Sequence, residues 1–441
     1  MVHLLTSATG DLTVKWKAGL ILGENVPKKF ENYTKVVFFT KRALRQGQRD
    51  AWYFSFNIAK NGLYKEISGN LKELFLKQQI DPEIHVLIIQ NADKILGHEW
   101  REVLNSYRSQ NEDVNNVLAE KLNGFQAAPE PLKIDLKTKE DRFKGALFGH
   151  VIGDAMGAPI EILSLEEIKE RYGLVTDFVR YEYQTLDEGD YTDDSAFTFA
   201  GMDSILSQHG FNVYDYSKRL SELITAMDLG QDNDRHYGSG SIMAMRRLSV
   251  GQHWKFSGNN NPKNGAAIRM VPLAIVDCFD PQRNLKKNVE LACEPTHKNP
   301  FAQEAAYLMA AGVRYCLDSE HFDVEKFLDY ILQECSSDEF REKIKKVREL
   351  LHEDTHIDQA QAVFGTEGLV LQCVPYTFFC FLKNPYNFKD VMISALNVDG
   401  DSDSIAAMAG SLCGALNGYS SLPKEWIDKL TAKERLASYF K

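Results

Sequence analysis

Acidic and hydroxyl side chains alternate in the stretch NVDGDSDSIAAMAGSLCGALNG, residues 397–418. Asp399, Asp401 and Asp403 stand at every second position, directly before a run of Ala, Gly and Leu. Carboxylates this crowded repel one another, so their ionisation calls for a nearby cation or the partial positive charge of a helix start. Asp and Ser are also common N-cap residues, but three acids so close together favour a metal over capping alone.

The same stretch does not fit an EF-hand calcium loop. Counted from Asp399, the sixth position is Ser404, where that loop needs Gly. The twelfth position is Gly410, where the loop needs a bidentate Glu. Further ligands for a metal must therefore come from elsewhere in the chain.

A second group of oxygen-bearing side chains lies in YTDDSAF, residues 191–197. Thr192, Asp193 and Asp194 precede an apolar face, so capping of a helix by Thr192 or Ser195 is the alternative explanation. Two such clusters in one chain make capping alone a poorer account of both. Hard divalent cations such as Mg²⁺ and Mn²⁺ prefer carboxylate and hydroxyl oxygens in octahedral sets. We therefore expect the clusters to face each other and to hold two such ions.

The element before these clusters reads as a helix with one smooth face. DRFKGALFGHVIGDAMGAPIEI, residues 141–162, has glycine at every fourth position from Gly145 to Gly157, which clears one helix face for close packing. Asp154 lies within this helix, and Glu161 follows its Ala-Pro break. A carboxylate placed on a helix breaker is a candidate site residue, although Glu161 could equally lie on an ordinary surface turn.

Three glycine- or asparagine-containing turns could bind a ligand. DRHYGSGSIMAMRRL, residues 234–248, leads small residues into a basic helix whose free N–H groups could bind phosphate. NPKNGAAIR (261–269) and EPTHKNP (294–300) are further polar turns before helices. His297 could touch a substrate, orient a metal ligand or be a satisfied core residue.

Composition and charge set the outer limits. The chain has 441 residues, 44% hydrophobic and 26% charged, as in globular proteins with two cores. It contains no apolar run long enough to span a membrane and no secretory signal, and its seven cysteines, all from Cys278 onward, form no CxxC pair. These features predict a cytoplasmic protein, with export into another cell left open. The net charge of −11 disfavours nucleic acid as a partner, although residues 1–128 are slightly basic.

The expected fold class is α+β. Residues 1–128 are predicted to form a small α/β domain with strands at VVFF (36–39) and HVLII (85–89) and a helix over 63–79. A Pro-containing linker is predicted over 129–138 and an all-α domain over 139–441. The first domain shows no active-site motif, so we expect it to recognise a client or to target the protein.

Five motifs in order resemble the ADP-ribosylglycohydrolase family. They are GALFGHVIGDAMGAPIE, YTDDSAF, NGAAIRMVPLAI, EPTHKNP and NVDGDSDSIAAMAGSLCGALNG. The resemblance covers about 139–441 and is most like the dinitrogenase-reductase-activating glycohydrolases and the ADP-ribosylarginine hydrolases. It implies an all-α catalytic domain with a binuclear Mg²⁺ centre, Mn²⁺ being possible, that hydrolyses the bond between ADP-ribose and its target.

The resemblance also implies roles for individual residues. The metal ligands would be Thr192, Asp193, Asp194, Asp401, Asp403 and Ser404. The catalytic residues would be Glu161, Asp193 and Asp403, with Glu161 as acid or base. Substrate contacts would come from His236, Tyr237, Gly238, Ser239, Gly240, Ser241, Asn264, Gly265 and His297. Tyr237 would stack on the adenine, for which Phe364 and Tyr376 are alternatives. In the nitrogenase-regulating relatives a catalytic Asp stands where this chain has His236, so Asp232 or Asp234 takes that role or the role is absent.

The expected activity is metal-dependent removal of ADP-ribose from a mono-ADP-ribosylated protein, which leaves ADP-ribose as a product. Arginine is the favoured linkage, on the likeness to the arginine-specific branches alone. Two alternatives stay open: hydrolysis of serine- or nucleic-acid-linked ADP-ribose, and non-catalytic binding of ADP-ribose or of an ADP-ribosyltransferase.

Overall fold

The computed structural model describes residues 75–76, 82–92, 96, 100–123, 131–161, 163–180, 186–232, 235–249, 251–280 and 282–441. The described chain forms two compact units. The first comprises residues 1–130 and 246–256, and the second comprises residues 131–245 and 257–441. The domain limits at 128 and 139 stay a prediction. The sequence did not indicate that residues 246–256 belong to the first unit.

The described part of the first unit is helical. Its helices are α6 (Pro82–Gln90), α8 (Trp100–Ser106) and α9 (Glu112–Asn123). The stretch HVLII at 85–89, expected to be a strand, lies inside α6, so the predicted α/β domain and the α+β class are wrong. A short apolar run buried on all sides has no periodicity that separates a strand from a helix, and Val86 to Ile89 are fully buried. The other predicted strand, VVFF at 36–39, lies outside the described residues.

Helices also make up the second unit, in agreement with the expected all-α domain. The described residues contain two isolated β-bridges, Asn259–His297 and Lys263–Leu369, and no strand. The helices, including two that reach residues 246–256, are α10 (Glu140–Gly157), α11 (Leu165–Tyr172), α12 (Asp193–Gln208), α13 (Val213–Asp228), α14 (Ser239–Ser249), α15 (Trp254–Ser257), α16 (Val271–Asp277), α17 (Leu285–Cys293), α18 (Pro300–Asp318), α19 (Val324–Glu334), α20 (Asp338–His352), α21 (Ile357–Phe364), α22 (Val370–Lys383), α23 (Phe388–Leu396), α24 (Ser402–Asn417), α25 (Lys424–Lys429) and α26 (Lys433–Ser438). Short 3-10 helices cover Leu136–Lys139, Asn264–Arg269 and Tyr419–Ser421.

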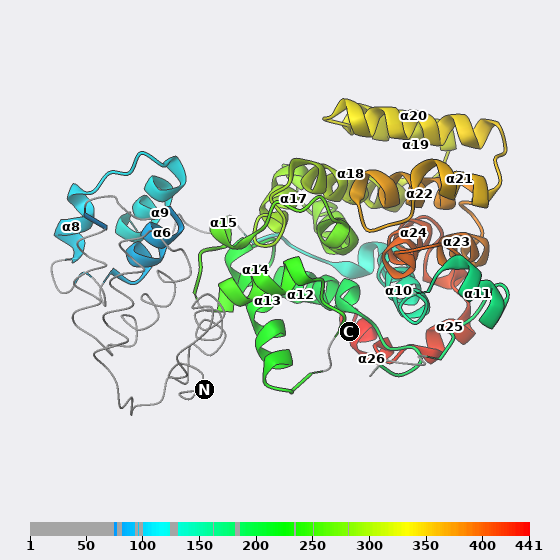
Figure 1. Ribbon diagram of the computed structural model, residues 1–441, viewed down its shortest axis with the longest axis horizontal. Helices are drawn as coiled ribbons and strands as arrows, with labels where there is room; N and C mark the ends of the chain where they lie inside the picture. Colours follow the sequence, from blue (N-terminus) through cyan, green and yellow to red (C-terminus); the bar gives the residue numbers. More distant parts are fainter. Residues whose placement is uncertain are drawn as a thin grey trace, which may run out of the picture. The chain divides into compact units, whose positions relative to one another are not determined.

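The core of the second unit surrounds α24, which packs on α10, α18, α22 and α23 (Figure 1). Its closest neighbour is α10. A Cβ atom added at Gly145 would lie 2.1 Å from the Gly414 carbonyl oxygen, and one at Gly149 would lie 2.3 Å from the Gly410 oxygen. The glycine spacing read from the sequence therefore serves backbone-to-backbone packing of two helices. We call this contact the α10–α24 seam.

No helix among the described residues is long and apolar enough to cross a bilayer. All seven cysteines are free thiols, and six of them are buried.

Candidate active site

A buried carboxylate fixes the start of α12. Asp154, on α10 and fully buried, accepts hydrogen bonds from the Thr192 backbone N–H (3.1 Å) and hydroxyl (2.7 Å). It also accepts bonds from the backbone N–H (3.0 Å) and hydroxyl (2.5 Å) of Ser195. Thr192 is the N-cap of α12, as the alternative explanation of this motif anticipated, and its oxygen accepts the Asp194 N–H. Asp154 had no predicted role. The sequence feature that could have indicated a role for Asp154 is a carboxylate inside an apolar, glycine-rich helix.

A buried arginine ties this cluster to the loop before α14. The Asp193 N–H donates to the Arg235 carbonyl (2.7 Å), and the Arg235 guanidinium binds Asp190 (2.7 Å) and Asp232 (3.2 Å). The Gly238 N–H in turn donates to the Asp193 carboxylate (3.3 Å). Asp232 is therefore engaged by Arg235, which argues against its replacing the Asp of the nitrogenase-regulating relatives. Asp234, the other candidate, lies outside the described residues.

The second acidic cluster is held at the start of α24. Asp401 precedes the helix, and its N–H donates to the Thr366 carbonyl (2.9 Å). The Asn264 side-chain amide donates to the Asp401 carboxylate (2.8 Å). Gly368 gives this carboxylate room, since a Cβ atom there would lie 2.5 Å from its Oδ2. Asn264, predicted to contact substrate, thus also orients one of the predicted metal ligands.

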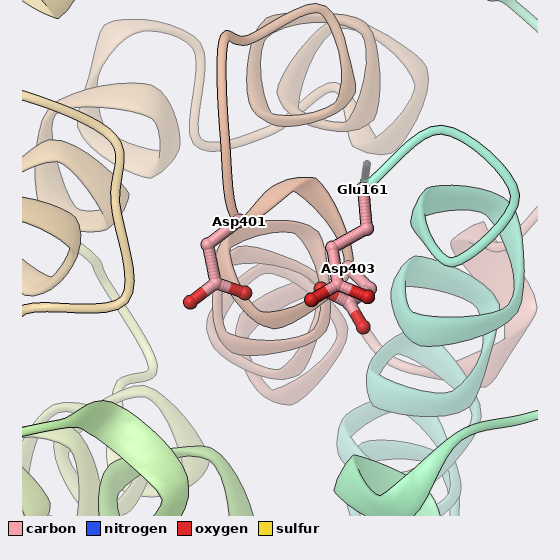
Figure 2. A group of neighbouring side chains, drawn as sticks. All are labelled: Glu161, Asp401 and Asp403. Atoms are coloured by element: carbon pink, nitrogen blue, oxygen red, sulfur yellow. The ribbon is translucent and has the colours of Figure 1, made fainter. Parts of the chain in front are cut away.

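The α10–α24 seam brings Glu161 to this cluster. A Cβ atom at Gly157 would lie 2.4 Å from the Asp403 Cα, so the end of α10 lies directly against the start of α24. Figure 2 shows Glu161 on the loop after α10 and the two aspartates at the start of α24. Carboxylate oxygens of Glu161, Asp401 and Asp403 lie within 4.8 Å of one another. Three acids this close form a plausible cation site.

The electrostatics of the cluster also fit a cation. Burial, followed by the charges of Asp401 and Asp154, raises the pKa of Glu161 to about 7. Burial and neighbouring carboxylates raise the pKa values of Asp193, Asp194 and Asp403 well above the usual range. The buried Asp194 Oδ2 has no hydrogen-bond partner among the described residues. Hard oxygen donors with this much uncompensated charge suit Mg²⁺ or Mn²⁺.

These residues share a cavity of about 810 Å³ with the donor groups of the glycine-rich loop. The predicted site residues that line it are Glu161, Asp193, Asp194, His236, Gly238, Ser239, Gly240, Ser241, Asn264, Gly265, His297, Asp401, Asp403 and Ser404. Thr192 and Tyr237 are not among the lining residues. The Thr192 hydroxyl donates to Asp154, and the buried Tyr237 ring packs against Phe197, with 5.5 Å between ring centroids.

Further lining residues were not assigned to the site from the sequence. Glu167, Glu367 and Asp399 add carboxylates to the wall, and Lys263 adds a positive charge. Asp399 was noticed in the sequence but given no ligand role. Glu167 and Glu367 lie in unremarkable sequence, where no residue pattern indicated proximity to the other acids.

Comparisons with known proteins point to one family. The sequence profile described as ADP-ribosylglycohydrolase matches residues 135–440. An uncharacterized protein of Archaeoglobus fulgidus is 30% identical over 299 residues, which cover 67% of this chain and 94% of that protein. The ADP-ribosylhydrolase ARH3 of Mus musculus is 26% identical over 333 residues, which cover 65% of this chain and 86% of the mouse protein.

A solved structure agrees in fold. The structure is titled an ADP-ribosylglycohydrolase-related protein complex, and it superposes with a TM-score of 0.52 at 23% identity. The superposition covers 69% of this chain and 97% of the other. On the profile match over most of its length, this chain belongs to the ADP-ribosylglycohydrolase family and is a glycosidic bond hydrolase that removes ADP-ribose.

Proposed function

We propose that the protein removes ADP-ribose from a mono-ADP-ribosylated protein, with two Mg²⁺ ions bound and arginine as the modified residue. The observation that supports this most is the two-part wall of the 810 Å³ cavity. Carboxylates that suit cations form one part, and backbone donors that suit an anion form the other. ADP-ribose combines a diphosphate with a ribose diol, so it needs both kinds of surface.

The start of α14 is the proposed diphosphate site. The first hydrogen bond of this helix runs from the Ile242 N–H to the Gly238 carbonyl, so the N–H groups of Ser239, Gly240 and Ser241 precede the helical ladder. Such groups, together with the helix dipole, attract phosphate oxygens. The small side chains let a diphosphate approach the backbone closely.

The two acidic clusters are the proposed metal ligands. Thr192, Asp193 and Asp194 would hold an ion from one side, and Asp401, Asp403 and Ser404 from the other. Mg²⁺ is proposed, with Mn²⁺ as the alternative, because every donor is a hard oxygen. When bound, the ions would supply positive charge that fixes the ribose hydroxyls and stabilises the transition state.

Glu161 is the proposed general acid and base. Burial raises the pKa of Glu161 above its usual range, which lets the carboxyl group both accept and donate a proton near neutral pH. The carboxylate takes a proton from the water that attacks the anomeric carbon, while the bond from that carbon to the arginine nitrogen breaks through an oxocarbenium-like state. The proton then passes to the leaving nitrogen. Asp193 and Asp403 keep the water and the ribose in place beside Glu161.

The acidic wall supports arginine as the linkage. Glu167, Glu367 and Asp399 line the cavity in addition to the proposed ligands. Their negative charges attract the guanidinium group of an ADP-ribosylated arginine, which is cationic in the substrate and becomes cationic again once the leaving nitrogen has taken the proton. A serine hydroxyl would gain nothing from them, and a nucleic acid would be repelled.

The first unit is proposed to select the modified client, and the cytoplasm is the proposed location. The support for the location is chemical: seven free thiols, six of them buried, persist in a reducing compartment.

Incubation of the full chain and Mg²⁺ with defined arginine-, serine- and DNA-linked ADP-ribose tests the proposal. Free ADP-ribose should be released fastest from the arginine conjugate. Faster release from serine or DNA would overturn the proposed linkage. Binding of all conjugates without release, in the presence of Mg²⁺, would instead identify a binding protein.

A further inference from the structure

A buried histidine reaches the cavity wall through a gap left by a glycine. His297 is 3% exposed and lines the cavity beside Gly265. A Cβ atom at Gly265 would lie 2.9 Å from the His297 Cε1 and 3.2 Å from its Nε2. The same Cβ position lies 3.6 Å from the Ser241 hydroxyl, at the start of α14. The Nε2 side of the ring therefore adjoins the loop proposed for the diphosphate.

The other ring nitrogen is bound to the neighbouring threonine. His297 Nδ1 lies 2.9 Å from the Thr296 hydroxyl oxygen. The same oxygen lies 2.5 Å from Nη2 of Arg269 and 3.5 Å from the Cys293 carbonyl. The direction of the hydrogen bond to His297 depends on how this hydroxyl shares its single proton.

Arg269 settles that direction. A guanidinium group has N–H donors and no acceptor, so its 2.5 Å contact requires Thr296 to accept. The hydroxyl proton must then go either to His297 Nδ1 at 2.9 Å or to the Cys293 carbonyl at 3.5 Å. Hydroxyl donors rarely bond beyond 3.0 Å, so the proton goes to Nδ1. Nδ1 is therefore an acceptor without a proton of its own.

The position of Arg269 is itself strongly constrained. Its side chain is 2% exposed and lies over the rings of Phe197 (5.1 Å) and Tyr216 (5.6 Å). Nη2 also donates to the Ala292 carbonyl (3.2 Å). Burial, with a smaller effect of the Arg269 charge, lowers the pKa of His297 to about 3, so the imidazole is neutral at physiological pH. A neutral ring without a proton on Nδ1 carries its proton on Nε2.

We propose that Arg269 and Thr296 act as positioning residues that hold His297 in its neutral Nε2–H tautomer, which gives the cavity wall a fixed hydrogen-bond donor. The acceptor is an oxygen of the diphosphate or of the adjoining ribose, an assignment that rests on the proposed function. The donor is uncharged, so it adds directional binding without adding a cation close to the metal ligands. It also needs no reorganisation when substrate arrives.

Nitrogen NMR of the full-length protein labelled with ¹⁵N-histidine tests the tautomer directly. Protonated and unprotonated ring nitrogens resonate at separate positions, and a His297→Gln spectrum assigns the signals. The expected result is a bare Nδ1 and a protonated Nε2 that do not change between pH 5 and 8. A proton on Nδ1, or titration of the ring in this range, overturns the proposal whether or not ADP-ribose binds.

Two variants of Thr296 test whether this residue positions His297. Thr296→Val removes the hydroxyl at nearly constant volume and should alter the His297 nitrogen signals and weaken ADP-ribose binding about 5- to 10-fold, as expected for one neutral hydrogen bond. Thr296→Ser is the matched control, and it should restore both the signals and the affinity. KM should rise in the valine variant while kcat stays within about 2-fold.

The tautomer of His297 and its ligand are tested by different outcomes. The wild-type protein could show the expected tautomer and yet fail to bind ADP-ribose. That result would support the positioning of His297 by Arg269 and Thr296, and it would overturn ADP-ribose as the ligand in the proposed function. Unchanged affinity in a valine variant with altered ring signals overturns the donor role of His297.

Discussion

The α10–α24 seam predicts a sharp effect of adding one methyl group. In Gly157→Ala the new Cβ would lie 2.4 Å from the Cα and 2.5 Å from the backbone N of Asp403. Ordinary contacts of a Cβ atom lie at 3.4–4 Å, so the start of α24 must move by about 1 Å. Both atoms that clash belong to the backbone and cannot turn aside as a flexible side chain would.

The displacement acts on stability and on catalysis in different proportions. Overpacking of a core costs about 1–3 kcal/mol in the free energy of unfolding. The moving residue is Asp403, whose carboxylate belongs to the group within 4.8 Å of Glu161 and Asp401. A misplacement of about 1 Å at an active site lowers turnover roughly 10²-fold. We therefore expect a folded protein with a modest loss of stability and a large loss of kcat.

Gly145→Ala is the matched control for this prediction. Its Cβ would lie 2.1 Å from the Gly414 carbonyl oxygen, an equally severe clash in the same seam. Gly145 lies 12 positions before Gly157, about 18 Å along the helix and away from the acidic cluster. Its kcat should stay within about 5-fold of wild type, while both variants lose similar stability in urea titrations. Equal kcat losses in the two variants, or full activity in Gly157→Ala, would refute the reasoning.

Three further predictions concern charge. Glu161→Gln should lower turnover by roughly 10²–10⁴-fold with little change in ADP-ribose affinity. Product release measures the turnover, and calorimetry measures the affinity. Loss of binding with normal turnover of the residual complex would make Glu161 a structural residue. Asp401→Ala should abolish release of ADP-ribose in a protein with unchanged circular dichroism, as should excess EDTA in the wild type; activity that survives both would contradict the metal site. In EDTA, the stability contributed by Glu161 should be complete below its unfolded pKa of 4.5 and be lost as the pH rises through about 7, because the folded state holds the proton more tightly. The free energy of unfolding should fall by about 3 kcal/mol over this range, at 1.36 kcal/mol per pKa unit. Urea titrations at a series of pH values measure this fall. The same fall in Glu161→Gln would assign the pH dependence to other groups.

Most of the residues predicted for the site line the cavity. They could be predicted because the acids and hydroxyls of each cluster are close together in the sequence. Acids and hydroxyls within a few positions of each other, as at 192–194 and 401–404, indicate a shared ligand before any fold is known. The glycine spacing of 145–157 likewise indicated close packing of one helix face. Its partner could not be read from the sequence, because nothing in α10 indicates which of the later helices is smooth enough to meet it.

The errors arose where burial or tertiary contact decides the outcome. The stretch at 85–89 is apolar on every side, and only its packing shows that it is helical. Tyr237 has the right chemistry to stack on a base, and the sequence did not show that its ring packs against Phe197; its contact with adenine stays a prediction. Asp154 organises the first cluster through bonds to residues 38 and 41 positions away, which no local pattern reveals.

The seam also has a consequence for the order of events during synthesis. Gly157 and Ser402 meet in the folded protein but are separated by 245 residues. At roughly 5–20 residues per second, a ribosome needs about 10–50 s to make the intervening chain. Throughout this time α10, with its buried Phe, Leu, Val and Ile side chains, lacks the partner that covers its glycine face. Thr431, whose hydroxyl binds Asp190 beside Arg235, emerges later still. A nascent chain therefore has no assembled acidic cluster until Asp401 and Asp403 have left the ribosome, and the glycine face of α10 stays uncovered until then.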